Sequence, residues 1–259
     1  MAEIRFRGGG FAPRDIPVAS VATLVVCVLL WQGGASAGWI STKFLPTPWA
    51  IAQALYALAV SGELWANLSI SLQRLAIGWS IGTAAGLLVG LVVGLFTLAR
   101  SPGMAVVSAL FPIPKIALVP LFIIWFGIGE GSKVVTLAFG VFFPTVINVV
   151  AGVDAVPRNL IRMGQSFGLS WSAVVRKIVL PGALPTILAG FRITVSIAIV
   201  LLVAAEMIGA EKGIGAFVLA AGNLYDTDNL LAGIVLLSAM GLAASWIIGR
   251  LEKWFLRWR

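Results

Sequence analysis

The side chains that could do chemistry in this sequence are few, and most are single charges set among apolar residues. Arg74, Lys115, Arg192 and Glu206 fall within or at the edge of long hydrophobic runs. Charges at such depths in a membrane usually line a path for ions or solutes, or pair with one another. We therefore predict a path or gate rather than a reaction centre, with these candidate residues: Arg74, Pro114, Lys115, Trp125, Arg192 and Glu206.

Each of these charges has a plainer alternative. Arg74 either extends its guanidinium to the lipid headgroups or faces a water-filled cavity. Glu206 either forms part of a gate, held shut against another chain, or is an interfacial carboxylate in water. Lys115 either lines a path or belongs to a merely kinked helix. Arg192 and Glu206 lie fourteen residues apart on one expected helix, roughly 21 Å, so they cannot pair directly.

The rest of the sequence offers no catalytic apparatus. It has no histidine, and its one cysteine, Cys27, lies in an apolar run, so there is no disulfide framework. The segment Gly131–Lys133 is similar to the end of a phosphate-binding loop but lacks its Gly-Lys pair and a preceding strand. We expect no catalytic residue, no metal site and no cofactor held by this chain. A membrane-embedded enzyme is the alternative that these absences disfavour.

Composition determines the class of protein. Of 259 residues, 60% are hydrophobic and 11% charged, which is too little charge for a soluble surface. The net charge of +8 does not indicate a nucleic-acid partner, because the basic residues gather in the segments expected on the cytoplasmic side. Those residues are Arg5, Arg7, Arg14, Arg100, Arg158, Arg162, Arg176, Lys177, Arg250, Lys253, Arg257 and Arg259. Only Lys43, Lys133 and Lys212 fall in segments expected outside.

We predict an all-α polytopic membrane protein with six transmembrane helices and both termini in the cytoplasm. Residues 1–15 form a cytoplasmic leader, and residues 16–259 form one membrane domain. A cleaved signal peptide is an alternative for the first apolar run, since Ala35-Ser36-Ala37 is typical of a cleavage site. The predicted spans are about 16–34, 68–98, 104–128, 134–153, 186–208 and 229–248.

The sequence also predicts the structure of the segments that connect the spans, and a break within the third span. Residues 100–103 should form a tight cytoplasmic turn, and residues 130–133 a short external one. Pro112, Pro114 and Pro120 should break the third span, leaving carbonyl groups that protein or water must satisfy. Residues 210–228 are too interrupted by glycine for a span and are expected to form a short external or partly re-entrant hairpin.

Glycine recurs at every fourth position of the second predicted span. On a helix this spacing forms a smooth stripe that lets another helix approach closely. We favour packing within the bundle over dimerisation through this stripe. The residues are Gly78, Gly82, Gly86, Gly90 and Gly94.

The segment 154–185 is too polar to cross a bilayer and carries four of the basic residues. We predict two short helices, Asn159–Phe167 and Trp171–Leu180. Gly168 should take a positive φ between them, and Pro181 should end the second. Such a helical hairpin beneath a membrane domain could dock a soluble partner; an ordinary amphipathic loop is the alternative.

This segment resembles the cytoplasmic loop of binding-protein-dependent ABC importer permeases. Gly168, Ile178, Leu180 and Pro181 occupy the family's Gly–nine spacers–Ile–one spacer–Leu-Pro register, but residues 162–164 are Arg-Met-Gly where the family has Glu-Ala-Ala. The reversed charge puts in doubt any ion pair that the family makes through that glutamate. The resemblance implies contact with an ATPase through Arg162, Met163, Gly164, Ser166, Phe167, Gly168, Ser170, Trp171, Ile178, Leu180 and Pro181.

Further segments are similar to the nitrate, taurine and aliphatic-sulfonate branch of that family, and to its sulfonate permeases in particular. They are Phe111–Lys133, Trp39–Ser41 with Leu45-Pro46, Ser61–Trp65 and Val203–Glu206, and the likeness extends from about residue 38 to the C-terminus. The resemblance implies a type I importer fold in a bacterial inner membrane.

The resemblance also implies the partners and the cargo. They are a second copy of this chain, two ATPase subunits that bind ATP and Mg, membrane lipid, and a periplasmic or lipid-anchored solute-binding protein. The implied cargo is a small anion of the sulfonate, taurine or nitrate type. A neutral heterocycle or vitamin precursor as cargo, and a scaffold subunit without a path, are the alternatives.

Overall fold

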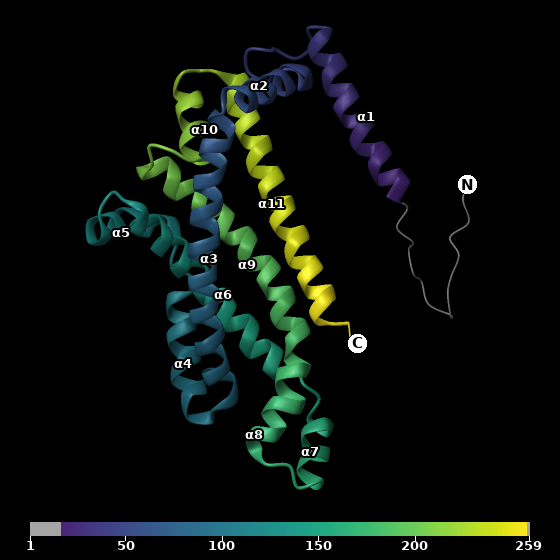
Figure 1. Cartoon of the computed structure of the whole chain (residues 1–259), viewed down its shortest axis with the longest axis vertical. Coiled ribbons are helices and arrows are strands. Elements are labelled where there is room, and N and C mark those ends of the chain that lie inside the picture. The colour runs from purple at the N-terminus through teal and green to yellow at the C-terminus, as the bar shows by residue number, and fades with distance from the viewer. Residues whose placement is uncertain (1–16, 258–259) are drawn as a thin grey trace.

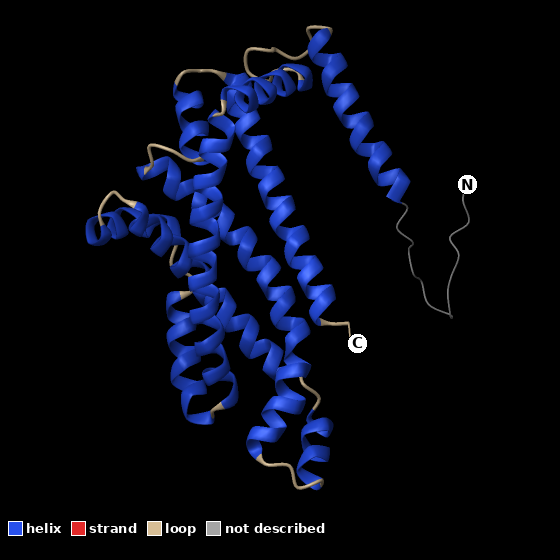
Figure 2. Ribbon diagram, viewed as in Figure 1, coloured by secondary structure: helices blue, strands red, loops and turns tan. Residues whose placement is uncertain are grey.

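The computed structural model describes residues 17–257, and within that range every regular element is a helix (Figures 1 and 2). The predicted leader, residue 16 of the first span, and Arg5, Arg7, Arg14 and Arg259 lie outside the described residues. The elements are α1 (Pro17–Ser36), α2 (Pro48–Ser61), α3 (Glu63–Leu95), α4 (Thr97–Leu110), η1 (Lys115–Leu118), α5 (Val119–Phe126), α6 (Glu130–Asp154), α7 (Arg158–Ser166), α8 (Trp171–Val174), η2 (Val175–Val179), α9 (Leu180–Gly209), α10 (Ile214–Asn223) and α11 (Thr227–Phe255).

Five segments are long and apolar enough to cross a membrane: α1, α3, α6, the continuous α8–η2–α9 segment, and α11. A sixth span results if α4 and the η1–α5 segment count as one broken crossing, and this agrees with the predicted number. The helices α2 and α10 lie at one end of the molecule, and α7 and α8 lie at the opposite end (Figure 1). We call these the α10 end and the α7 end.

The third predicted span differs most from the structure. The expected turn at residues 100–103 is wrong, because those residues lie inside α4 and the chain turns one residue after α3, at Phe96. Pro102 lies inside α4, beyond its first turn, so the helix continues through it with one bond of the hydrogen-bond ladder missing. The prolines do break the span: α4 and the following η1–α5 segment meet at an angle of 83°.

The structure also places the ends of several other spans at residues that differ from the predicted ones. The second span begins at Glu63, because Gly62 with φ +84° separates α2 from α3 directly. Residues 130–133, expected in an external turn, form the first turn of α6. The last span begins earlier than predicted, at Thr227, where the Asp226 side chain accepts a hydrogen bond from the Asn229 amide at 3.2 Å.

The glycine stripe of α3 packs against α6, as predicted for contacts within the bundle. A β-carbon on Gly82 would lie 2.4 Å from the carbonyl oxygen of Ala138, and one on Gly90 would lie 2.7 Å from Cβ of Val149. Because no side chain could occupy these positions, the two backbones approach closely. The α6 helix is the most buried of the candidate spans and forms the centre of the bundle.

The second helix of the 154–185 segment does not stop at Pro181. Pro181 lies just after the π-helical turn Val175–Val179, and this turn joins α8 to α9 without a break, so the helix continues through the proline. One continuous helical rod therefore runs from Trp171 to Gly209. The tertiary packing of this rod against α6 and α11 overrides the local stop signal.

Candidate functional site

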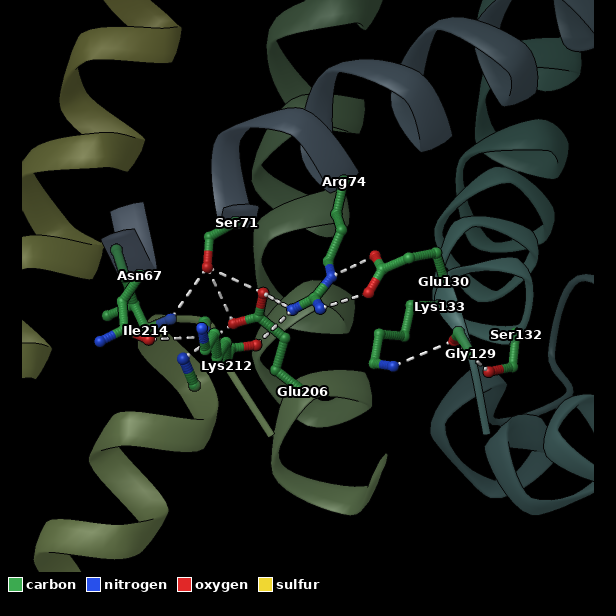
Figure 3. Close-up of polar contacts among 12 residues, drawn as sticks. Asn67, Ser71, Arg74, Gly129, Glu130, Ser132, Lys133, Glu206, Lys212 and Ile214 are labelled. Carbon is green, nitrogen blue, oxygen red and sulfur yellow. Dashed lines mark hydrogen bonds and ion pairs between the residues drawn. The ribbon is translucent and has the colours of Figure 1, made fainter. Parts of the chain in front are cut away.

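Glu206 is the most deeply buried charge in the described part of the chain. Its side chain has no solvent exposure, although it lies three residues before the end of α9. Oε1 accepts hydrogen bonds from Arg74 Nη1 and from the Ser71 hydroxyl, each at 2.8 Å. Oε2 accepts from the Gly215 amide, also at 2.8 Å. Figure 3 shows these contacts of Glu206. Because the side chain has no solvent exposure, the alternative that Glu206 is an interfacial carboxylate in water is wrong.

Asn67 and Ser71, which both lie on α3, cap the N-terminus of α10. Asn67 Oδ1 accepts from the Gly213 amide and Ser71 Oγ accepts from the Ile214 amide, both at 2.9 Å. The first amides of a helix have no partner within it and carry partial positive charge, so a carboxylate beside them is stabilised. Gly213 has φ +127°, and a β-carbon there would lie 2.5 Å from Cδ of Glu206, so this turn requires glycine.

Arg74 joins this cap to α6. It is 4% exposed, and its Nε and Nη2 atoms each donate to a Glu130 carboxylate oxygen at 2.6 Å. Its Nη1 also donates to the Lys212 carbonyl oxygen at 2.6 Å. The guanidinium thus links α3, α6, α9 and the segment before α10, and it does not extend to the headgroups as one alternative proposed.

A cavity of about 450 Å³ opens beside Arg74. Lys133, which is 4% exposed, contributes to its wall and donates a hydrogen bond to the Gly129 carbonyl oxygen at 3.0 Å. The lining contains three basic and two acidic side chains among apolar ones. These residues are Ile70, Gln73, Arg74, Ile77, Ile128, Glu130, Lys133, Val134, Gly209, Glu211 and Lys212.

The other predicted path residues lie elsewhere. Lys115 Nζ donates to the carbonyl oxygens of Leu110 and Phe111, so it satisfies the carbonyl groups that the broken span leaves free. Pro114 directly precedes η1, and Trp125 is exposed on α5. Arg192 forms an ion pair with Glu252 of α11, with Nη2 and Oε2 2.6 Å apart. The structure brings together only Arg74 and Glu206 of the six.

Sequence reasoning missed Asn67, Ser71, Glu130 and Lys133. A signal for the first two was present: Asn67, Ser71 and Arg74 are spaced four and three residues apart and form one polar stripe on an apolar helix. Glu130 and Lys133 were assigned to a turn, where both would have been solvated. Their proximity to Arg74 depends on how α6 packs on α3, which no local pattern indicates.

The α7 end carries the residues expected to couple to an ATPase. As predicted, Gly168 has a positive φ of +71° between the two short helices. A β-carbon on Gly164 would lie 2.7 Å from Cδ1 of Ile178, so a small residue lets α7 close on the second helix. Ser170 Oγ accepts from the Ala173 amide at 3.4 Å and caps α8.

Most other residues of this set are open to solvent, and Phe167, at 79% exposed, is the most open of the large apolar ones. The Trp171 ring lies 5.3 Å from that of Phe96, at the junction of α3 and α4. Leu180 and Pro181 are partly buried at the start of α9. The exposed members are Arg162, Met163, Ser166, Phe167, Gly168, Ser170 and Trp171.

Comparison with known proteins agrees with this architecture. Residues 82–257 match the family described as "Binding-protein-dependent transport system inner membrane component". The putative aliphatic sulfonates transport permease protein SsuC of Escherichia coli K12 is 40% identical over 95% of this chain and 91% of its own length. SsuC of Bacillus subtilis 168 is 34% identical over 90% and 85%. The taurine transport system permease protein TauC of E. coli K12 is 34% identical over 92% and 89%.

Among solved structures, an inward-facing conformation of the MetNI methionine ABC transporter contains a chain with the same fold. The TM-score is 0.62 at 22% identity, and the match covers 82% of this chain and 98% of that one. A second crystal form of MetNI gives a TM-score of 0.59 at 21% identity. The predicted type I importer fold is thereby confirmed.

Proposed function

Because this chain belongs to the family of binding-protein-dependent transport system inner membrane components, we propose that it forms the membrane path of an ATP-driven importer for a small anion. The sulfonate and taurine permeases among its relatives support a cargo of the sulfonate, taurine or nitrate type. The cationic side chains of Arg74, Lys133 and Lys212 around the cavity suit such a cargo.

The proposed assembly contains two copies of this chain in a bacterial inner membrane, with both termini in the cytoplasm. Two separate subunits hydrolyse ATP with Mg at the α7 end, and a solute-binding protein delivers cargo at the α10 end. Permeases of this family are not themselves enzymes, so this chain contributes two alternative packings whose balance the partners shift.

One observation carries the proposed mechanism: Trp171, Ile178, Leu180 and Pro181 of the coupling set lie on the same continuous helix as Glu206. The rod Trp171–Gly209 begins in the exposed α7 end, and Glu206 lies near its other end. At about 1.5 Å per residue, the separation between Trp171 and Glu206 is roughly 50 Å. Closure of the ATPases would tilt this rod, and the tilt would pull Glu206 against Arg74 on α3.

The test is ATP-dependent uptake by the reconstituted complex. Proteoliposomes containing this permease, its ATPase and its binding protein should accumulate ethanesulfonate, taurine or nitrate, and should not accumulate riboflavin as a neutral heterocycle. Uptake of riboflavin without uptake of any of the three anions would overturn the proposed cargo. A complex that hydrolyses ATP but moves no solute would favour the scaffold alternative.

Reversing the charge of Arg162 is expected to weaken assembly. Arg162 is exposed on α7, where the family has glutamate, so we propose that it contacts a carboxylate of the ATPase. Arg162→Glu should lower the amount of ATPase that co-purifies with the permease by about tenfold, typical of losing a charge-assisted hydrogen bond. Lys43→Glu, an exposed charge reversal outside the 154–185 segment, is the control. Equal co-purification by both variants would contradict the contact.

Gly168→Val is expected to uncouple ATP hydrolysis from uptake. A β-branched residue is strained at φ +71°, so the turn should shift and displace the exposed Phe167 beside it. Gly168→Asn is the matched control, because asparagine tolerates this conformation at lower cost. Uptake per ATP hydrolysed should fall several-fold in the valine variant alone. Normal coupling in both would remove Gly168 from the coupling assignment.

A further inference from the structure

Lys133 is a buried cation without an acidic partner among the described residues. Its side chain is 4% exposed, and none of the carboxylates described lies within 4.0 Å of Nζ. Its one hydrogen bond goes to a neutral backbone carbonyl, that of Gly129. An ammonium group has three donors, and burying it with one neutral acceptor is costly. Lys133 lies in the wall of the cavity beside Arg74, where an anion could serve as its partner.

The first turn of α6 forms part of the wall of this cavity. Glu130 is its first residue, and the preceding Gly129 provides no side-chain cap. The α6 helix has 25 residues, and Glu130 and Lys133 of its first turn line the cavity together with Arg74. Two buried cations, Arg74 and Lys133, therefore line one space of about 450 Å³ together with the carboxylates of Glu130 and Glu211, and this volume is within the range of small-molecule sites.

Glu130 occupies the position that an external anion would take. Its two oxygens accept from Nε and Nη2 of Arg74 in the forked geometry that guanidinium also offers to other oxyanions. The Glu130 side chain is nevertheless 63% exposed, whereas Glu206 on the other side of Arg74 is fully buried. Glu130 can therefore turn into solvent while Glu206 keeps Arg74 paired.

We propose that this cavity binds the sulfonate or carboxylate group of a small organic anion, which displaces Glu130 from Arg74 and pairs with Lys133. The proposal rests on the proposed function, since it assigns a site for the cargo within a single permease chain. It gives Glu130 the role of a competing internal anion. Departure of the solute lets Glu130 return to Arg74 and refill the site.

The test measures binding of ethanesulfonate to the purified full-length permease in phosphatidylcholine nanodiscs by calorimetry. Glu130→Gln removes the competing charge while Arg74 stays paired with Glu206, so affinity should rise by about tenfold. Lys133→Gln removes the unpaired cation, so affinity should fall by about tenfold. Lys43→Gln, on an exposed residue distant in sequence, is the matched control and should bind as the wild type does.

The gain of affinity is the decisive outcome, because a residue with a merely structural role would not bind ligand better after its removal. Unchanged or weaker binding by a folded Glu130→Gln variant would overturn the proposal. Ethyl methyl sulfone, which lacks the charge, should not bind. Nanodiscs containing phosphatidylglycerol provide a second arm: loss of ethanesulfonate binding there would assign the same site to a lipid headgroup.

Failure of this inference can be told apart from failure of the proposed function. If the reconstituted complex imports sulfonate while neither variant changes binding by the permease, only the site is wrong. If the complex imports no anion at all, the proposed function is wrong. A thermal unfolding curve for each variant shows whether the fold is kept, and Lys133→Met replaces Lys133→Gln if that variant unfolds.

Discussion

Arg74→Gln should lower the free energy of unfolding by about 3 to 5 kcal/mol, the usual cost of removing one partner from a buried ion pair. The reason is Glu206, which has no solvent exposure and would keep its charge without a cation beside it. Ser71 and the Gly215 amide would still donate to it, but neither carries a charge. Thermal unfolding of the purified chain in detergent, followed by tryptophan fluorescence, measures the loss.

Two controls separate this cost from the mere loss of an arginine. Arg100→Gln removes an ion pair with Asp154 in which both side chains are more than two-fifths exposed, so it should cost less than about 1 kcal/mol. The double variant Arg74→Gln with Glu206→Gln leaves neither member of this pair as an uncompensated buried charge and should recover most of the stability. Equal losses for Arg74→Gln and Arg100→Gln would show that the buried network does not contribute as argued.

Gly82→Ala should destabilise the fold by about 2 to 3 kcal/mol, the upper range for overpacking a close contact. The added methyl group would lie 2.4 Å from the Ala138 carbonyl oxygen and 2.8 Å from its Cα. Both are backbone atoms of α6, so no rotamer change can relieve the clash and the helices must separate. The same separation would draw Arg74 on α3 away from Glu130 on α6, so affinity in the cavity should change as well.

The same substitution at other glycines supplies a graded control. At Gly94 the new methyl group would lie 3.2 Å from a Val153 side-chain methyl, which can yield by a few tenths of an ångström. At Gly33 in α1 nothing lies within 4 Å. The midpoint of thermal unfolding should therefore fall most for Gly82→Ala, less for Gly94→Ala, and not at all for Gly33→Ala. Another order would contradict the close packing of α3 on α6.

Residue types and spacing in the sequence were enough to identify the class of protein and the family, and they predicted six crossings, where the structure has five long apolar helices and one broken pair. Long apolar runs determine which segments enter a bilayer, because the cost of burying charge there is large and local. The every-fourth-residue glycine spacing of α3 likewise predicted a helix contact, since helix periodicity alone puts those residues on one face. The glycine register around Gly168 predicted the turn between α7 and α8 for the same local reason.

Only the tertiary structure decided where the charges meet. Arg74, Glu130 and Glu206 are separated by more than fifty residues each, and they form one network because α3, α6 and α9 pack together. The continuation of α9 through Pro181 was decided in the same way, since helix packing outweighs a local stop signal. Local patterns report what each segment prefers by itself, whereas the partner of a buried charge depends on contacts between segments that are distant in the sequence.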